Sequence, residues 1–249
     1  MKEKLKNGKD KIFSKIKHIN NKRNENTEKY NRLNFWLLVL FPVFISCMAE
    51  INQGKSVVAF LKFLVERPTV MLFNFMIAYL LFYILLAIFK KGWIPAVIQG
   101  FVYMMLSTVE LFKFGTNGNH LILSDMKLFK SVKSLTSFAY TKITVPLVAF
   151  WLIAIAAVAA VFWFNPKLNM KPVKRVITAG MCCLPCVSLI TLPGFSTSVY
   201  SLFDVDTTAA SNTFLLNEKF KSNSFLAFLV ETATESYSNR LVEPEDYNE

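Results

Sequence analysis

Five long apolar stretches fill most of this 249-residue chain. They cover residues 33–49, 70–89, 94–112, 143–164 and 176–192. A helix that rises about 1.5 Å per residue needs about 20 residues to cross a bilayer core about 30 Å thick. Soluble domains interrupt their apolar runs with polar residues, whereas residues 70–89 hold one strongly polar residue, Asn74. The pattern predicts an all-α membrane protein with five transmembrane helices, interfacial amphipathic helices and a short extracellular helical tail.

Basic residues are unevenly distributed among the segments that join these stretches. Residues 1–32, 90–93 and 165–175 hold 17 Lys or Arg in 47 positions, whereas the other connecting segments hold 11 in 107. Because cytoplasmic loops carry an excess of basic residues, we predict a cytoplasmic N-terminus and an extracellular C-terminus. The basic residues cluster at membrane boundaries, so the net charge of +11 argues against nucleic acid as a partner.

The predicted spans divide the chain into three regions. Residues 1–32 form a cytoplasmic basic tail, and residues 33–192 form the five-helix transmembrane domain. Residues 193–249 form an extracellular juxtamembrane linker with three basic and nine acidic residues. The first apolar stretch follows 32 polar residues and no small-residue cleavage site follows it, so we interpret it as a retained span.

Two connecting segments are predicted to form helices at the membrane surface. Residues 54–68 are apolar but too short and too charged to span a bilayer. The second helix follows Ser124, which is a suitable N-cap residue. Helical spacing places its basic residues on one side: Lys127, Lys130 and Lys133.

These lysines have two interpretations. They bind the headgroup of an anionic phospholipid, together with His120, Ser124 and Asp125, or they belong to a packing helix and only face water. Glu110, near the end of the third stretch, also has two interpretations. An intramembrane carboxylate is a functional candidate, but an ion pair with Lys113 three residues on is the simpler expectation.

Cys183 and Cys186 have the spacing of a thiol redox motif. A membrane thiol oxidoreductase is therefore one hypothesis, although the pair lies in the middle of a predicted span and small residues commonly pack between helices there. The cysteines and the two histidines do not form a recognisable zinc motif, so we expect no metal or other cofactor in this chain.

Two short motifs outside the spans are similar to segments of a known family. The segment Phe114-Gly-Thr-Asn-Gly-Asn-His-Leu-Ile-Leu-Ser-Asp125 resembles the family segment "rGtPllpSDl", with Leu123 in place of the family proline. The tail segments Asn223–Leu229 and Val242–Tyr247 resemble "NGFLlaFl" and "vekPegYs". With five spans and an outward C-terminus, the chain resembles the membrane domain of the lipoteichoic acid synthase-like phosphoglycerol transferases of the sulfatase superfamily.

The resemblance implies a bacterial cell membrane and a catalytic domain after this linker. In that domain a threonine nucleophile and a divalent metal, often manganese, transfer glycerol phosphate from phosphatidylglycerol. Those residues have no counterpart here, so we expect the chain alone to be inactive, to anchor the enzyme and to present anionic phospholipid to the extracellular catalytic domain. The alternative is a stand-alone polytopic protein with a binding or regulatory role and a protein partner.

Overall fold

The computed structural model describes residues 14, 27–54, 56–122, 144–166, 171–210 and 212–241, and it confirms the all-α membrane class. Five of its helices are long and apolar enough to cross a membrane. They are α2 (Thr27–Gly54), α4 (Pro68–Phe89), α5 (Trp93–Asn117), α7 (Val145–Phe164) and α8 (Pro172–Thr191). Three further helices join them: α3 (Val57–Glu66), α9 (Pro193–Leu202) and α10 (Thr213–Leu241).

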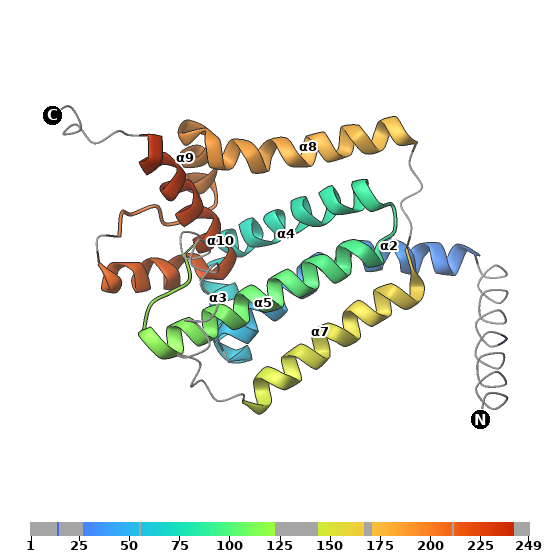
Figure 1. Ribbon diagram of the computed structural model, residues 1–249, viewed down its shortest axis with the longest axis horizontal. Coiled ribbons are helices and arrows are strands. Elements are labelled where there is room, and N and C mark those ends of the chain that lie inside the picture. Colours follow the sequence, from blue (N-terminus) through green and yellow to red (C-terminus); the bar gives the residue numbers. More distant parts are fainter. Residues whose placement is uncertain are drawn as a thin grey trace, which may run out of the picture.

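The three helices α2, α4 and α5 form the centre of the bundle, with α7 and α8 on its two sides (Figure 1). Ile45 of α2, Phe82 of α4 and Met104 of α5 are almost completely buried in one apolar cluster. Gly100 lets α5 and α7 approach closely, because a Cβ at this position would lie 3.0 Å from Cγ2 of Val158. The helices α7 and α8 expose most of their apolar side chains, as expected of helices that face lipid.

The spanning helices extend beyond the apolar stretches of the sequence. The first candidate span runs over Arg32–Gly54 and the third over Trp93–Thr116, whereas hydropathy placed their ends at residues 49 and 112. Polar residues occupy the added turns, and in α2 the side chains of Glu50 and Asn52 are hydrogen-bonded inside the protein. Pro68, Pro146 and Pro172 lie in first turns, where a missing N–H costs no helix hydrogen bond.

The segment predicted at residues 54–68 contains α3, which ends before Pro68. The Ser56 side chain caps this helix by accepting a hydrogen bond from the Ala59 N–H at 3.1 Å. None of its residues is buried, and Val58, Leu61 and Val65 are exposed along one face.

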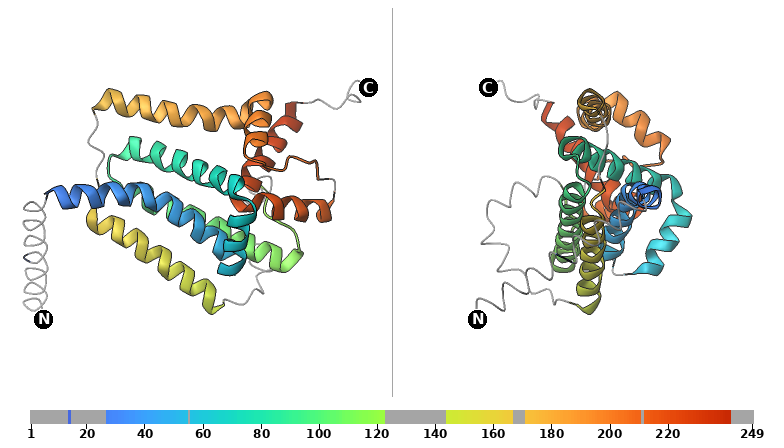
Figure 2. Two further views of the ribbon diagram at one scale, coloured as in Figure 1. Left: turned by 180° about the vertical axis from the view of Figure 1, so that it is seen from behind. Right: turned by 90° about the vertical axis from the view of Figure 1, so that its right-hand side faces the viewer.

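The helices α3, α9 and α10 gather at one end of the bundle, which we call the α10 end (Figures 1 and 2). The second part of α10 lies across this end of the spans instead of extending away from it (Figure 1). Its residues Phe225–Leu229 are all buried. The tail is helical, as predicted, and it packs against the spans, because burying each large apolar side chain contributes about 1.5–3 kcal/mol.

The opposite end of the bundle has simpler contacts. Arg175 of α8 donates hydrogen bonds to the carbonyl oxygens of Ala87 and Ile88 at the end of α4. A guanidinium at a helix C-terminus also interacts favourably with the helix dipole. The Gly92 N–H donates to the Pro166 carbonyl oxygen at 2.7 Å, which holds the start of α5 against the end of α7.

Candidate functional site

The carboxylate of Glu50 is buried at the α10 end of α2, and only 4% of the residue is exposed. Its Oε1 accepts hydrogen bonds from Asn74 Nδ2 at 3.3 Å and from the Phe225 N–H at 3.1 Å. Its Oε2 accepts hydrogen bonds from Gln53 Nε2 at 3.3 Å and from the Ser224 hydroxyl. We call these five residues the Glu50 centre; it joins α2, α4 and α10.

Ser224 interrupts α10 and starts its second part. Its backbone has φ 62° and ψ −175°, a conformation that is almost restricted to glycine. The chain therefore turns sharply at this residue, and the helix that resumes at Phe225 has N–H groups without partners in its own first turn. The Glu50 carboxylate accepts a hydrogen bond from one of these N–H groups, that of Phe225. Its negative charge also interacts favourably with the dipole at the helix N-terminus.

A small pocket of about 170 Å³ lies beside the Glu50 centre. Its polar lining comes from α2, from the residue that caps α3 and from α10: Glu50, Gln53, Ser56, Lys221 and Ser224. Its apolar lining comes from α3 and from the first part of α10: Ala59, Phe60, Phe63 and Phe220. The pocket thus combines hydrogen-bonding groups and one cation with an aromatic wall.

Glu110 forms a second buried carboxylate contact at the same end of the bundle. Its Oε1 lies 2.5 Å from Nδ1 of His120, and its Oε2 accepts a hydrogen bond from the Leu121 N–H at 2.5 Å. Lys113, the partner predicted from the sequence, donates to the His120 carbonyl oxygen at 2.6 Å. The three residues therefore meet, with His120 rather than Lys113 against the Glu110 carboxylate.

The His120 ring links this segment to the tail. It stacks on Phe220 of α10 with 3.6 Å between ring centroids and an interplanar angle of 4°. Its other face stacks on Phe114 at 4.5 Å, and Phe228 approaches it edge-on at 5.9 Å. Both parts of α10 thus contact the residues that follow α5.

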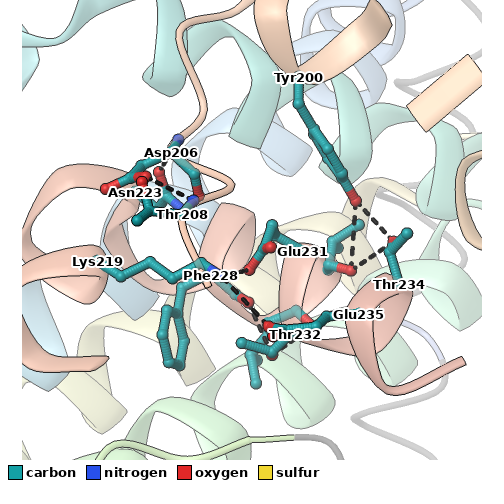
Figure 3. A network of polar contacts seen from close by, with 12 residues as sticks. Tyr200, Asp206, Thr208, Lys219, Asn223, Phe228, Glu231, Thr232, Thr234 and Glu235 are labelled. Carbon is teal, nitrogen blue, oxygen red and sulfur yellow. Dashed lines mark hydrogen bonds and ion pairs between the residues drawn. The ribbon is translucent and has the colours of Figure 1, made fainter. Parts of the chain in front are cut away.

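A third group of charges lies within α10 itself (Figure 3). Lys219, which is 2% exposed, pairs with Glu231 at 2.8 Å and with Glu235 at 3.3 Å. Burial raises the pKa of Glu231 to about 7, although the Lys219 ammonium opposes this change. The ion pairs bring the two parts of α10 together across the turn at Ser224.

Two hydrogen-bonded contacts connect α10 to α9 and to the segment after it (Figure 3). The Tyr200 hydroxyl lies 2.7 Å from the Thr234 hydroxyl, and burial raises the pKa of Tyr200 to about 12. Asn223 exchanges two hydrogen bonds with the backbone of Asp206, at 2.6 and 2.7 Å. These contacts hold α10 along its length.

The structure brings together only part of the predicted site. Glu110 and His120 meet, whereas Ser124, Asp125, Lys127, Lys130 and Lys133 lie outside the described residues. The cysteines Cys183 and Cys186 are free thiols on α8, the first exposed and the second partly buried. Within the described ranges, no three His, Cys, Asp or Glu side chains converge on a position that could hold a metal ion.

Sequence reasoning missed the Glu50 centre. Two signals pointed to it: Glu50 is the first charged residue after an apolar stretch, and Asn74 is the one strongly polar residue of the second. Two such residues on adjacent spans are candidates for a mutual hydrogen bond. Nothing in the local pattern indicates that Ser224 and Phe225 complete the centre.

Comparison of the chain with protein-family models, with curated proteins and with solved structures finds no match.

Proposed function

We propose that this chain is the membrane domain of a phosphoglycerol transferase of the lipoteichoic acid synthase-like kind. In this role it anchors the enzyme in a bacterial cell membrane and presents an anionic phospholipid, phosphatidylglycerol, to an extracellular catalytic domain. The metal of such an enzyme belongs to the catalytic domain. The predicted orientation puts the α10 end outside the cell.

The fixed position of α10 carries this proposal. The Glu50 centre holds the start of its second part, and Phe225 and Phe228 are buried against the bundle. A domain that follows or binds this helix would be held close to the membrane surface, where the headgroups of its lipid substrate lie. A flexible linker would let the same domain move away from that surface.

The experiment that tests the proposal deletes the coding sequence in the source cells. We expect a lower incorporation of labelled glycerol into phosphoglycerol polymers of the envelope, with recovery when the wild-type chain is restored. Glu50→Leu should restore incorporation only in part, because α10 loses its position. Leu152→Ala, a change on the exposed face of α7, is the control and should restore it fully. Unchanged incorporation after deletion would contradict the proposed function.

The stand-alone binding protein is the second candidate, and exposed apolar residues on the tail helices favour it. Leu202 at the end of α9 and Phe214 at the start of α10 are 73% and 70% exposed. Such residues can contact a protein partner at the membrane surface. A partner without a sulfatase-like catalytic domain, cross-linked at position 214 in intact cells, would favour this candidate.

A further inference from the structure

We propose that the pocket beside the Glu50 centre binds the headgroup of one phospholipid, and that a groove along α2 and α4 binds one of its acyl chains. The headgroup belongs to the class that carries a negative phosphodiester and free hydroxyls. This inference rests on the proposed function, because it gives the presented lipid a binding site.

The pocket has the chemistry of such a headgroup. The Lys221 ammonium pairs with the Glu218 carboxylate at 2.7 Å, and its remaining N–H donors are available to phosphate oxygens. The Gln53 amide and the Ser224 hydroxyl can exchange hydrogen bonds with hydroxyl groups of the ligand. Glu50 already accepts hydrogen bonds from four residues, so its oxygen atoms have their partners beneath the pocket. A trimethylammonium headgroup carries the same phosphodiester but no hydroxyl groups, so it would lose the hydrogen bonds with Gln53 and Ser224.

The pocket opens where a lipid can reach it. Phe60 and Phe63 of α3 form part of its wall, and α3 joins the ends of the spans α2 and α4. The exposed face of α3, with Val58, Leu61 and Val65, suits the headgroup and acyl boundary of a bilayer. With about 170 Å³ the pocket is smaller than the roughly 300–1,000 Å³ of pockets that enclose whole ligands, so it fits a headgroup and not an entire lipid.

A groove for an acyl chain lies on the same two spans, farther from the α10 end. It has a volume of about 480 Å³, and its lining is almost entirely apolar. The lining residues come from α2, α4 and α8: Val43, Leu72, Phe75, Met76, Tyr79, Leu80, Tyr83 and Cys182. The Tyr79 hydroxyl donates to the Val39 carbonyl oxygen at 2.6 Å, so it is satisfied without a ligand. Because every lining residue belongs to a spanning helix, the group that reaches this groove is a hydrocarbon chain.

The spacing of the two parts matches one lipid molecule. Val43 in the groove and Glu50 in the pocket are seven residues apart on α2, which places them on one face about 10 Å apart along the helix. The seated lipid therefore has its headgroup at the turn of α10 and its chain between α2 and α4. Figure 2 shows α3 beside these two spans at the α10 end.

The test measures which lipids stay with the purified full chain. The chain is reconstituted in nanodiscs that contain equal amounts of phosphatidylglycerol and phosphatidylcholine with the same acyl chains, and then transferred to detergent. Native mass spectrometry counts the retained lipids. We expect one retained phosphatidylglycerol per chain and little phosphatidylcholine.

Two variants address the two parts of the site, each with a matched control. Lys221→Gln should lower the retained phosphatidylglycerol about tenfold, as for the loss of one charge-assisted contact. The control Lys62→Gln changes another exposed lysine in a surface ion pair and should retain the lipid. Leu72→Trp fills the groove and should have a similar effect, whereas Leu152→Trp changes an equally exposed leucine on α7 and should not.

Several results would overturn the inference. Equal retention of the two lipids, or equal losses in variants and controls, would mean that the chain holds only bulk membrane lipid. Displacement of the lipid by soluble glycerol 3-phosphate would assign the pocket to a soluble phosphoglycerol compound instead. If the wild-type chain retains no phosphatidylglycerol selectively but still restores glycerol incorporation in the deleted cells, this inference is wrong and the proposed function stands. Selective lipid retention together with unchanged incorporation after deletion would leave the binding site standing and contradict the proposed function.

Discussion

Glu50 and Glu110 place two buried carboxylates at the same end of the bundle, and they differ in what they hold. Each accepts a hydrogen bond from a backbone N–H outside the spans: Glu50 from that of Phe225 and Glu110 from that of Leu121. The two bonds join residues that are 175 and 11 positions apart. Glu110 therefore fixes the chain that leaves its own helix, whereas Glu50 fixes the tail across the whole bundle.

The comparison shows how a membrane protein can position a distant helix. A carboxylate within a span is costly, so it is retained where several donors surround it. At the Glu50 centre the donors come from α2, α4 and α10, and the carboxylate is fully bonded only when α10 is in place. At Glu110 the donors come from the segment that directly follows α5.

The largest effect should follow from Glu50→Leu. The change leaves the Phe225 N–H and the Asn74 amide without their acceptor, which should lower the free energy of unfolding by about 3–5 kcal/mol. α10 should also detach, which limited proteolysis of the exposed segment at residues 207–209 will detect. Glu66→Leu on exposed α3 is the control. Equal proteolysis of the two variants would contradict the assigned role of Glu50.

Glu110→Leu should have a smaller and more local effect. The loss of its contacts to His120 and Leu121 should lower the free energy of unfolding by about 2–3 kcal/mol. Amide hydrogen exchange should become faster at Leu121 and remain slow at Phe225. If exchange at Phe225 rises as much as at Leu121, the two carboxylates act as one unit and the contrast between them is wrong.

Glu231 makes the stability of α10 depend on pH. Its pKa is raised from 4.5 to about 7 in the folded state, so the folded chain binds this proton more tightly than the unfolded chain. The associated stability is fully present below pH 4.5 and is lost as the pH rises through about 7. The melting temperature of the detergent-solubilised chain should therefore fall over this interval.

Glu231→Gln is the matched comparison for this titration. The variant has no carboxyl group at this position. Between pH 5 and pH 8 its melting temperature should therefore fall by roughly 2–4 °C less than that of the wild-type chain. Identical pH profiles for the two proteins would show that Glu231 does not titrate in this range.

The smallest effect is expected at Ser224, where two contributions oppose each other. Ser224→Gly removes the hydroxyl bonded to Glu50 but relieves a backbone conformation that costs about 1–3 kcal/mol, so the net change should be near zero. Ser224→Ala removes the hydroxyl and keeps the strain, and it should lower the free energy of unfolding by about 1 kcal/mol. Equal melting temperatures for the two variants would contradict this account.

Much of the fold could be predicted from the sequence, because hydropathy is a local property. The apolar stretches predicted five spans, and the structure has five candidate membrane-spanning helices. The helix predicted within residues 54–68 is α3. The helix α2 continues past its apolar stretch where polar residues such as Glu50 are bonded inside the protein, and hydropathy does not indicate such a continuation. The tail was interpreted as a linker from its resemblance to the family segments, and this resemblance does not indicate that Phe225–Leu229 packs against the spans.

Less of the candidate site could be predicted, for a physical reason. His120 was grouped with the residues that follow it in the sequence, yet its ring stacks on Phe220, which is 100 positions away in the chain. The pattern of residues around a helix does not indicate which distant segment will pack against it. The interpretations of Cys183, Cys186 and the lysines after Ser124 remain predictions.

The sequence by itself determined that this chain forms membrane-spanning helices. In lipid each span must satisfy its backbone hydrogen bonds within itself, so composition and length are enough to reveal it. Only the tertiary structure decided the partner of the Glu50 carboxylate, and with it the position of α10. That pairing joins donors from three helices, and it exists only once the helices have packed.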